Sequence, residues 1–89
     1  MITEIKRICK EAIEKAKEEA NNLRKEGDSV KDVIIRMVLK NESIIEFEFG
    51  RTDSAKFTFY DEGIKLLFPE NEKTYFIWYN EIRSIRRLK

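Results

Sequence analysis

The spacing of apolar residues changes once along this chain, from a helical period to a strand-like alternation. Between Ile2 and Leu23, apolar residues recur every three or four positions, as they do along a helix that buries one face. Beyond Asp28 and Ser29, apolar and polar residues alternate, as they do in strands. This order excludes an all-helical and an all-β chain, and it predicts an α+β domain.

The first segment predicts an N-terminal amphipathic helix over about residues 3–26. Thr3 is a suitable residue to cap the free N–H groups at the helix start, and Glu4 places a negative charge where the helix dipole favours one. Gly27 readily adopts the left-handed conformation that often ends a helix. The apolar stripe becomes rich in alanine in its second half, so we expect that half to pack closely on its neighbour.

Residues 28–89 predict an antiparallel meander of five or six strands. Turn-forming residues at 41–43, 50–54 and 61–63 separate the alternating segments. Pro69 ends a further segment because proline cannot donate to a sheet ladder. Short turns place successive strands side by side and antiparallel.

The last ten residues can be interpreted in two ways. Ile82, Ile85 and Leu88 recur at steps of three, which suits a helical turn, but a short turn followed by a sixth strand fits equally well. We prefer the turn and strand. In either case a chain of this length makes one domain, and we expect a single unit over residues 1–89, with residues 1–27 as its helix.

The predicted strands carry more apolar surface than one helix can cover. The expected core face consists of Val33, Ile35, Met37, Leu39, Ile45, Phe47, Phe49, Phe57, Phe59, Ile64, Leu66 and Phe68. The opposite face still carries Ile34, Val38, Ile44 and Leu67, and the segment from Tyr75 to Tyr79 is apolar on both sides. Strands of this kind are usually covered on both faces.

Two arrangements would cover the second face. The meander can curl into a small, partly open barrel, or a second protein chain can cover what the helix leaves bare. A helix over residues 3–26 would be about 36 Å long, whereas strands of six or seven residues span about 20–23 Å. The helix is therefore expected to extend beyond its own sheet. We expect the meander to curl into the barrel. We also expect the protein to form a homo-oligomer, most simply a dimer, or to bind another protein partner.

This surplus of apolar surface predicts a small, non-enzymatic interaction module. We expect it to act through protein–protein contact and to bind a second copy of itself. The candidate interface consists of Ile34, Val38, Ile44, Leu67, Phe76 and Trp78, together with the isoleucine-rich start of the helix.

An alternative function is nucleic-acid binding through the C-terminal end of the chain. Residues 28–82 contain seven basic and eleven acidic side chains, whereas the last seven residues contain four basic ones and no acidic one. The candidate contacts are Arg83, Arg86, Arg87 and Lys89. They follow an aromatic segment, and cations beside aromatic rings are the usual surface for single-stranded nucleic acid. The ordinary alternative is that the rings are core and the cations protect an edge strand from aggregation.

The composition argues against an enzyme, and we expect no catalytic, cofactor-binding or metal-binding residue. The chain has no His and one Cys, which removes His-dependent nucleophile pairs and the common zinc ligand sets. Cys9 lies on the apolar stripe of the helix and is expected to be buried. Glu46 and Glu48 have the spacing of a glycosidase pair, about 6.5–7 Å along a strand. Alternating Glu residues are, however, much more common as ordinary strand surface.

The sequence also favours a cytoplasmic protein without membrane contact. A single Cys cannot form an intrachain disulfide and suits a reducing compartment. The first residues lack the apolar core of a signal peptide, and no stretch approaches the roughly 20 apolar residues of a membrane span. A charged fraction of 39% and the absence of Gln are typical of proteins from hot environments, although five Asn residues point the other way.

Overall fold

The structure is a computed structural model that describes residues 2–49, 55–68 and 72–88. Within these ranges one helix is followed by six strands, which confirms the α+β fold. The elements are α1 (Ile2–Lys25), β1 (Ile34–Leu39), β2 (Ile44–Glu48), β3 (Lys56–Phe59), β4 (Gly63–Phe68), β5 (Lys73–Trp78), the 3-10 turn η1 (Tyr79–Glu81) and β6 (Ile82–Leu88). The prediction that the last ten residues form a turn and then a strand is confirmed.

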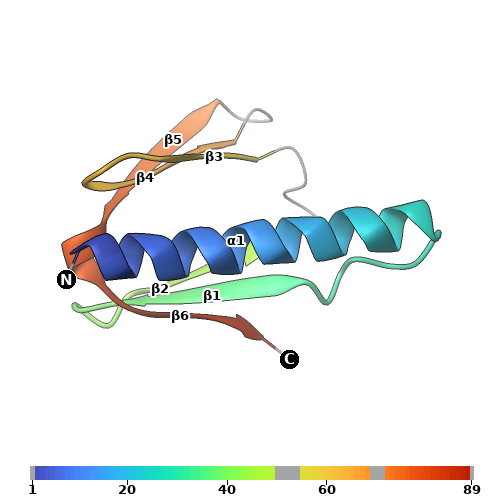
Figure 1. The fold of residues 1–89 in the computed structure, drawn as a ribbon, viewed down its shortest axis with the longest axis horizontal. Helices are drawn as coiled ribbons and strands as arrows, with labels where there is room; N and C mark the ends of the chain where they lie inside the picture. The colour runs from blue at the N-terminus through green and yellow to red at the C-terminus, as the bar shows by residue number, and fades with distance from the viewer. Residues whose placement is uncertain (1, 50–54, 69–71, 89) are drawn as a thin grey trace.

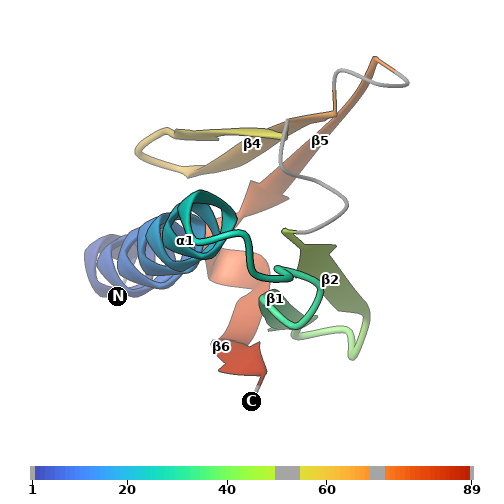
Figure 2. The ribbon, with the colours of Figure 1, turned by 90° about the vertical axis from the view of Figure 1, so that its right-hand side faces the viewer.

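The strands form two separate three-stranded antiparallel sheets, seen from two sides in Figure 1 and Figure 2. Sheet A has the order β2-β1-β6, and sheet B has the order β3-β4-β5. The described strands therefore do not form the expected barrel, since neither sheet is closed. The physical reason is that β6 leaves its neighbour β5 and returns to pair with β1, with a shift of register between Val38 and Leu39.

The turn η1 joins the two sheets at one end of the molecule. The Tyr79 N–H donates to the Glu62 carbonyl of the β3–β4 turn at 3.0 Å. The Lys40 N–H, directly after β1, donates to the Glu81 carbonyl at 2.8 Å. Because each bond holds η1 to the end of a different sheet, the chain changes sheets here instead of forming a β5–β6 hairpin.

Helix α1 closes one side of the space between the two sheets (Figure 2). It lies against β1, β6 and η1 through Cys9, Ile13, Ala16 and Ala20, whose exposed fractions are at most 1%. Ala16 and Ala20, from the alanine-rich second half of the helix, are both in this buried contact. The helix is also longer than the strands beneath it (Figure 1).

The inner faces of both sheets meet the helix in one core. The predicted core residues Val33, Ile35, Met37, Phe47, Phe49, Ile64 and Leu66 are buried, and the remaining five, Leu39, Ile45, Phe57, Phe59 and Phe68, are partly buried against them. Phe57 connects the sheets, because its ring centroid lies 5.5 Å from that of Phe47 and 6.1 Å from that of Phe49.

Two buried ionisable groups in this core, the Cys9 thiol and the Tyr79 hydroxyl, make the stability of the fold depend on pH in the alkaline range. Burial raises the pKa of Cys9 to about 11, and burial, together with the nearby Cys9 and Asp61, raises the pKa of Tyr79 to about 12. The Tyr79 hydroxyl is buried and has no hydrogen-bond partner among the described residues, so no contact there favours its ionised form.

We expect the free energy of unfolding to fall as the pH rises from about 9 to about 12. The unfolded chain releases these two protons near the ordinary pKa values of 9 and 10, whereas the folded protein retains them to about 11 and 12. Stability present below pH 9 is therefore lost across this window. Urea denaturation at several pH values should show a smaller loss in the Cys9→Ala/Tyr79→Phe double variant. An equal loss in both proteins would contradict the assignment.

Gly63→Ala is expected to cost about 1–3 kcal/mol of stability through overpacking. A Cβ atom at Gly63 would overlap the Ile77 carbonyl oxygen and lie 2.7 Å from the Phe76 ring. The matched control is Gly27→Ala, where no atom lies within 4 Å but φ is +79°, at a cost of about 1 kcal/mol. Urea denaturation compares the two variants, and a smaller loss at Gly63 than at Gly27 would show that the close approach is wrong.

Candidate functional site

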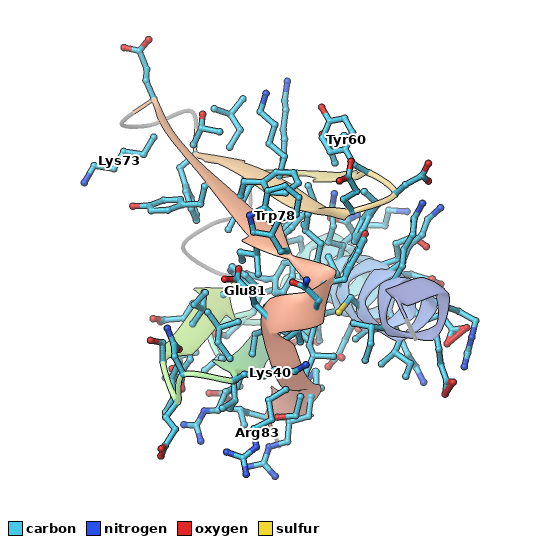
Figure 3. All side chains as sticks on the ribbon, turned by 90° about the vertical axis from the view of Figure 1, so that its left-hand side faces the viewer. Lys40, Tyr60, Lys73, Trp78, Glu81 and Arg83 are labelled. Carbon is cyan, nitrogen blue, oxygen red and sulfur yellow. The ribbon has the colours of Figure 1, made fainter. Side chains whose placement is uncertain are left out.

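Three aromatic side chains are exposed on the outer face of sheet B, and two of them, Tyr60 and Trp78, are labelled in Figure 3. Tyr60, Phe76 and Trp78 keep exposed fractions of 47%, 42% and 45%. Alternation along β5 explains the exposure of Phe76 and Trp78, since Ile77 between them points into the core. The Phe76 ring centroid lies 6.2 Å from that of Tyr60 and 4.8 Å from that of Trp78. We call these three residues the aromatic face.

Gly63 makes room for this cluster, although its sequence context predicted only a turn. It is the first residue of β4 and pairs with Trp78 across the strands. The Phe76 ring occupies the space that a side chain at Gly63 would fill. A glycine at the start of a strand was the available signal, because such glycines often mark a close approach.

The same face also carries lysine side chains on its strands and carboxylates in the turn at one end. Lys65 pairs with Phe76, and Lys56 lies one row further along, beside Leu67. The described strands place no carboxylate on this face. At its other end the β3–β4 turn carries Asp61 and Glu62, both exposed, and Asp61 Oδ1 lies 3.2 Å from the Lys6 ammonium. Carboxylates of the β3–β4 turn thus lie at one end of the face, and Lys65 and Lys56 lie toward the other end, where the exposed Glu72 precedes β5.

The candidate interface is divided between the two sheets. Leu67, Phe76 and Trp78 lie on the outer face of sheet B. By the strand register, Ile34, Val38 and Ile44 lie on the outer face of sheet A. The side chain of Ile44 is 58% exposed. Ile8, in the isoleucine-rich start of the helix, is 37% exposed. The structure therefore does not bring the six residues into one surface, because the predicted meander is two sheets.

The predicted nucleic-acid contacts are also separated. Arg87 Nε donates to Glu19 Oε1 at 2.9 Å, and its Nη2 makes a second, very short bond to Glu19 Oε2. This pair lowers the pKa of Glu19 and raises that of Arg87. Arg83 and Arg86 are exposed, and Lys89 lies outside the described residues. All of the described three belong to sheet A, whereas the aromatic face belongs to sheet B.

Two residues considered for catalysis, Glu46 and Cys9, have ordinary structural environments. Glu46 Oε2 lies 2.7 Å from Arg36 Nη2 across the strand pair. Cys9 is completely buried, and its raised pKa keeps it as a thiol. Within the described ranges, no group of three His, Cys, Asp or Glu side chains is placed to hold a metal ion.

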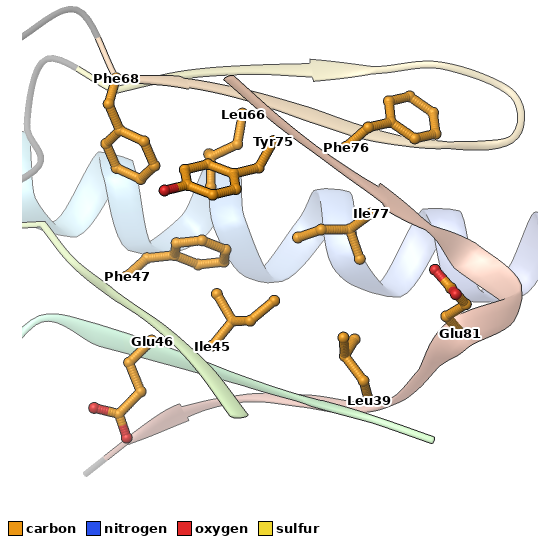
Figure 4. Close-up of a pocket in the computed structure, with 10 residues that line it drawn as sticks. All are labelled: Leu39, Ile45, Glu46, Phe47, Leu66, Phe68, Tyr75, Phe76, Ile77 and Glu81. Carbon is orange, nitrogen blue, oxygen red and sulfur yellow. The ribbon is translucent and has the colours of Figure 1, made fainter. Parts of the chain in front are cut away.

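A cavity of about 340 Å³ lies between the two sheets, on the side away from α1 (Figure 4). It is lined mainly by apolar side chains: Leu39, Ile45, Phe47, Leu66, Phe68, Tyr75 and Ile77, with Glu46, Phe76 and Glu81 at its margin. The edge strands β2 and β5 flank it. No local sequence pattern predicts this cavity, because its shape depends on how the two sheets diverge.

No family model matches the chain, and no curated protein or solved structure is similar enough to count as a match. In the part of the chain that the structure describes, no helix has both the length and the apolar character needed to cross a membrane.

Proposed function

We propose that this protein is a non-enzymatic interaction module that binds a second copy of itself through the outer face of sheet B. The observation that supports the proposal is the aromatic face. Aromatic residues are enriched at protein interfaces because they bury a large area with few rotatable bonds. Three of them in contact on one exposed face form a patch of the kind that marks interaction sites.

The charges of the face complement those of an inverted second copy. Lys65 and Lys56 lie progressively further from the acidic β3–β4 turn. If two copies pack face to face with their strands reversed, the Lys56 end of each sheet lies over the acidic turn of the other. A two-fold axis between the rows of Phe76 and Trp78 then sets each Trp78 against the partner's Phe76, and such an axis makes the contact isologous.

The size of the face predicts weak association. Three strands of up to six residues give a flat area of roughly 14 by 20 Å. This is smaller than the approximately 800 Å² that each partner buries in a standard interface. We therefore expect a reversible dimer with a dissociation constant of about micromolar or weaker.

Single-stranded nucleic acid is a second candidate partner. Lys65 stands beside the exposed Phe76 ring and Lys56 lies one row further along, and cations near exposed rings can bind phosphates while the rings stack on bases. The acidic turn beside Tyr60 opposes it, and Arg87 is engaged by Glu19. Labelled single-stranded DNA and RNA at about 50 mM salt test this candidate, since real binding weakens steeply with added salt. No retention under these conditions would remove it.

Trp78→Ala is expected to weaken the dimer at least about tenfold, as loss of a central aromatic residue commonly does. The matched control is Tyr75→Ala, because Tyr75 is on the same strand and 47% exposed but points to the opposite side of the sheet. Sedimentation equilibrium over a wide concentration range measures both, with circular dichroism to confirm folding. A wild-type protein that stays monomeric at about millimolar concentration, or equal effects of the two variants, would contradict the proposal.

A further inference from the structure

The cavity between the sheets has the size and lining of a small-ligand site. Its volume of about 340 Å³ is at the lower end of the range of roughly 300–1,000 Å³ found for ligand pockets. An apolar cavity of about 150 Å³ is already large enough to bind benzene. Leu39, Ile45, Phe47, Leu66 and Ile77 provide an apolar wall from both sheets, so the interior favours an apolar body about twice that size.

The two charged side chains among the described lining residues, Glu46 and Glu81, are both acidic. No Lys or Arg is among the described residues that line the cavity. Figure 4 shows the Glu46 carboxylate and the Phe76 ring directed away from the cavity, and Glu46 is already neutralised by Arg36 at 2.7 Å. Glu81 is the other carboxylate, and it stands at the end of the cavity beside Leu39 and Ile77 (Figure 4).

Glu81 is held in this place by the backbone of η1. Its carbonyl accepts the Lys40 N–H at 2.8 Å, whereas its carboxylate is exposed and has no hydrogen bond or ion pair within the described ranges. A single negative charge at the end of an apolar cavity complements a single positive charge on an apolar molecule. An anionic molecule would meet no Lys or Arg side chain among the described residues that line the cavity.

We propose that the cavity binds a small amphipathic cation, whose apolar body fills the space between the sheets and whose ammonium group lies at Glu81. This site is separate from the aromatic face, since the Phe76 ring points away from the cavity and Ile77 points into it. Binding here does not depend on self-association through sheet B.

Methyl NMR titration with decyltrimethylammonium below its micellar concentration tests the proposal. We expect saturable shifts at the methyl groups of Leu39, Ile45 and Ile77, which line the cavity. Ile44 and Leu67 are internal controls, because they lie on the outer faces and should not move. Decyl sulfate, with the same chain and the opposite charge, should bind at least about threefold more weakly, the scale of one exposed charge pair.

Two variants with matched controls separate the apolar and the charged contributions. Ile45→Trp should fill the cavity and abolish the shifts, whereas Ile44→Trp on the opposite face of the same strand should not. Glu81→Gln should weaken the cation about threefold and leave neutral decanol unchanged, whereas Glu62→Gln should affect neither.

Three results would overturn the proposal: no shift at the lining methyl groups of the wild-type protein, equal shifts at Ile44 and Leu67, or equal affinity for cation and anion. The wild-type titration and Glu81→Gln decide the matter even where Ile45→Trp does not fold.

Discussion

The architecture depends on the corner formed by Tyr79, Asn80 and Glu81. Two backbone hydrogen bonds tie it to both sheets, from the Tyr79 N–H to the Glu62 carbonyl and from the Lys40 N–H to the Glu81 carbonyl. With these bonds in place β6 cannot fold back on β5, and it completes sheet A instead. The two sheets then diverge from a common end, and the single helix covers the space between them on one side.

Both candidate sites follow from this divergence. On the side without the helix the two sheets line the cavity, and no described element covers the outer face of sheet B, so its three aromatic rings stay exposed to water. A domain of this size buries only about 60–65% of its unfolded surface, and this one also buries a Tyr79 hydroxyl that has no partner among the described residues. Exposed rings and an open cavity do not help to fold such a chain, which is why we propose binding roles for them.

The sequence was sufficient for every feature that depends on local spacing. The period of three to four gave the helix within one residue at each end, the alternation gave the core face, and the turn before Ile82 was correctly preferred. It was not sufficient for strand partnership, because no local pattern shows that β6 pairs with β1. The division of the candidate interface and the pairing of Arg87 with Glu19, 68 positions apart, follow from that partnership and could not be predicted.

Trp78 is the only tryptophan in the chain, so its fluorescence reports directly on the aromatic face. The most direct measurement is acrylamide quenching of Trp78 emission as the protein concentration is raised. Exposure on an uncovered face that binds a second copy predicts strong quenching in dilute protein, and both protection and a shift to shorter wavelength in concentrated protein. Protection already present in the dilute monomer, or quenching that stays strong at every concentration, would contradict it.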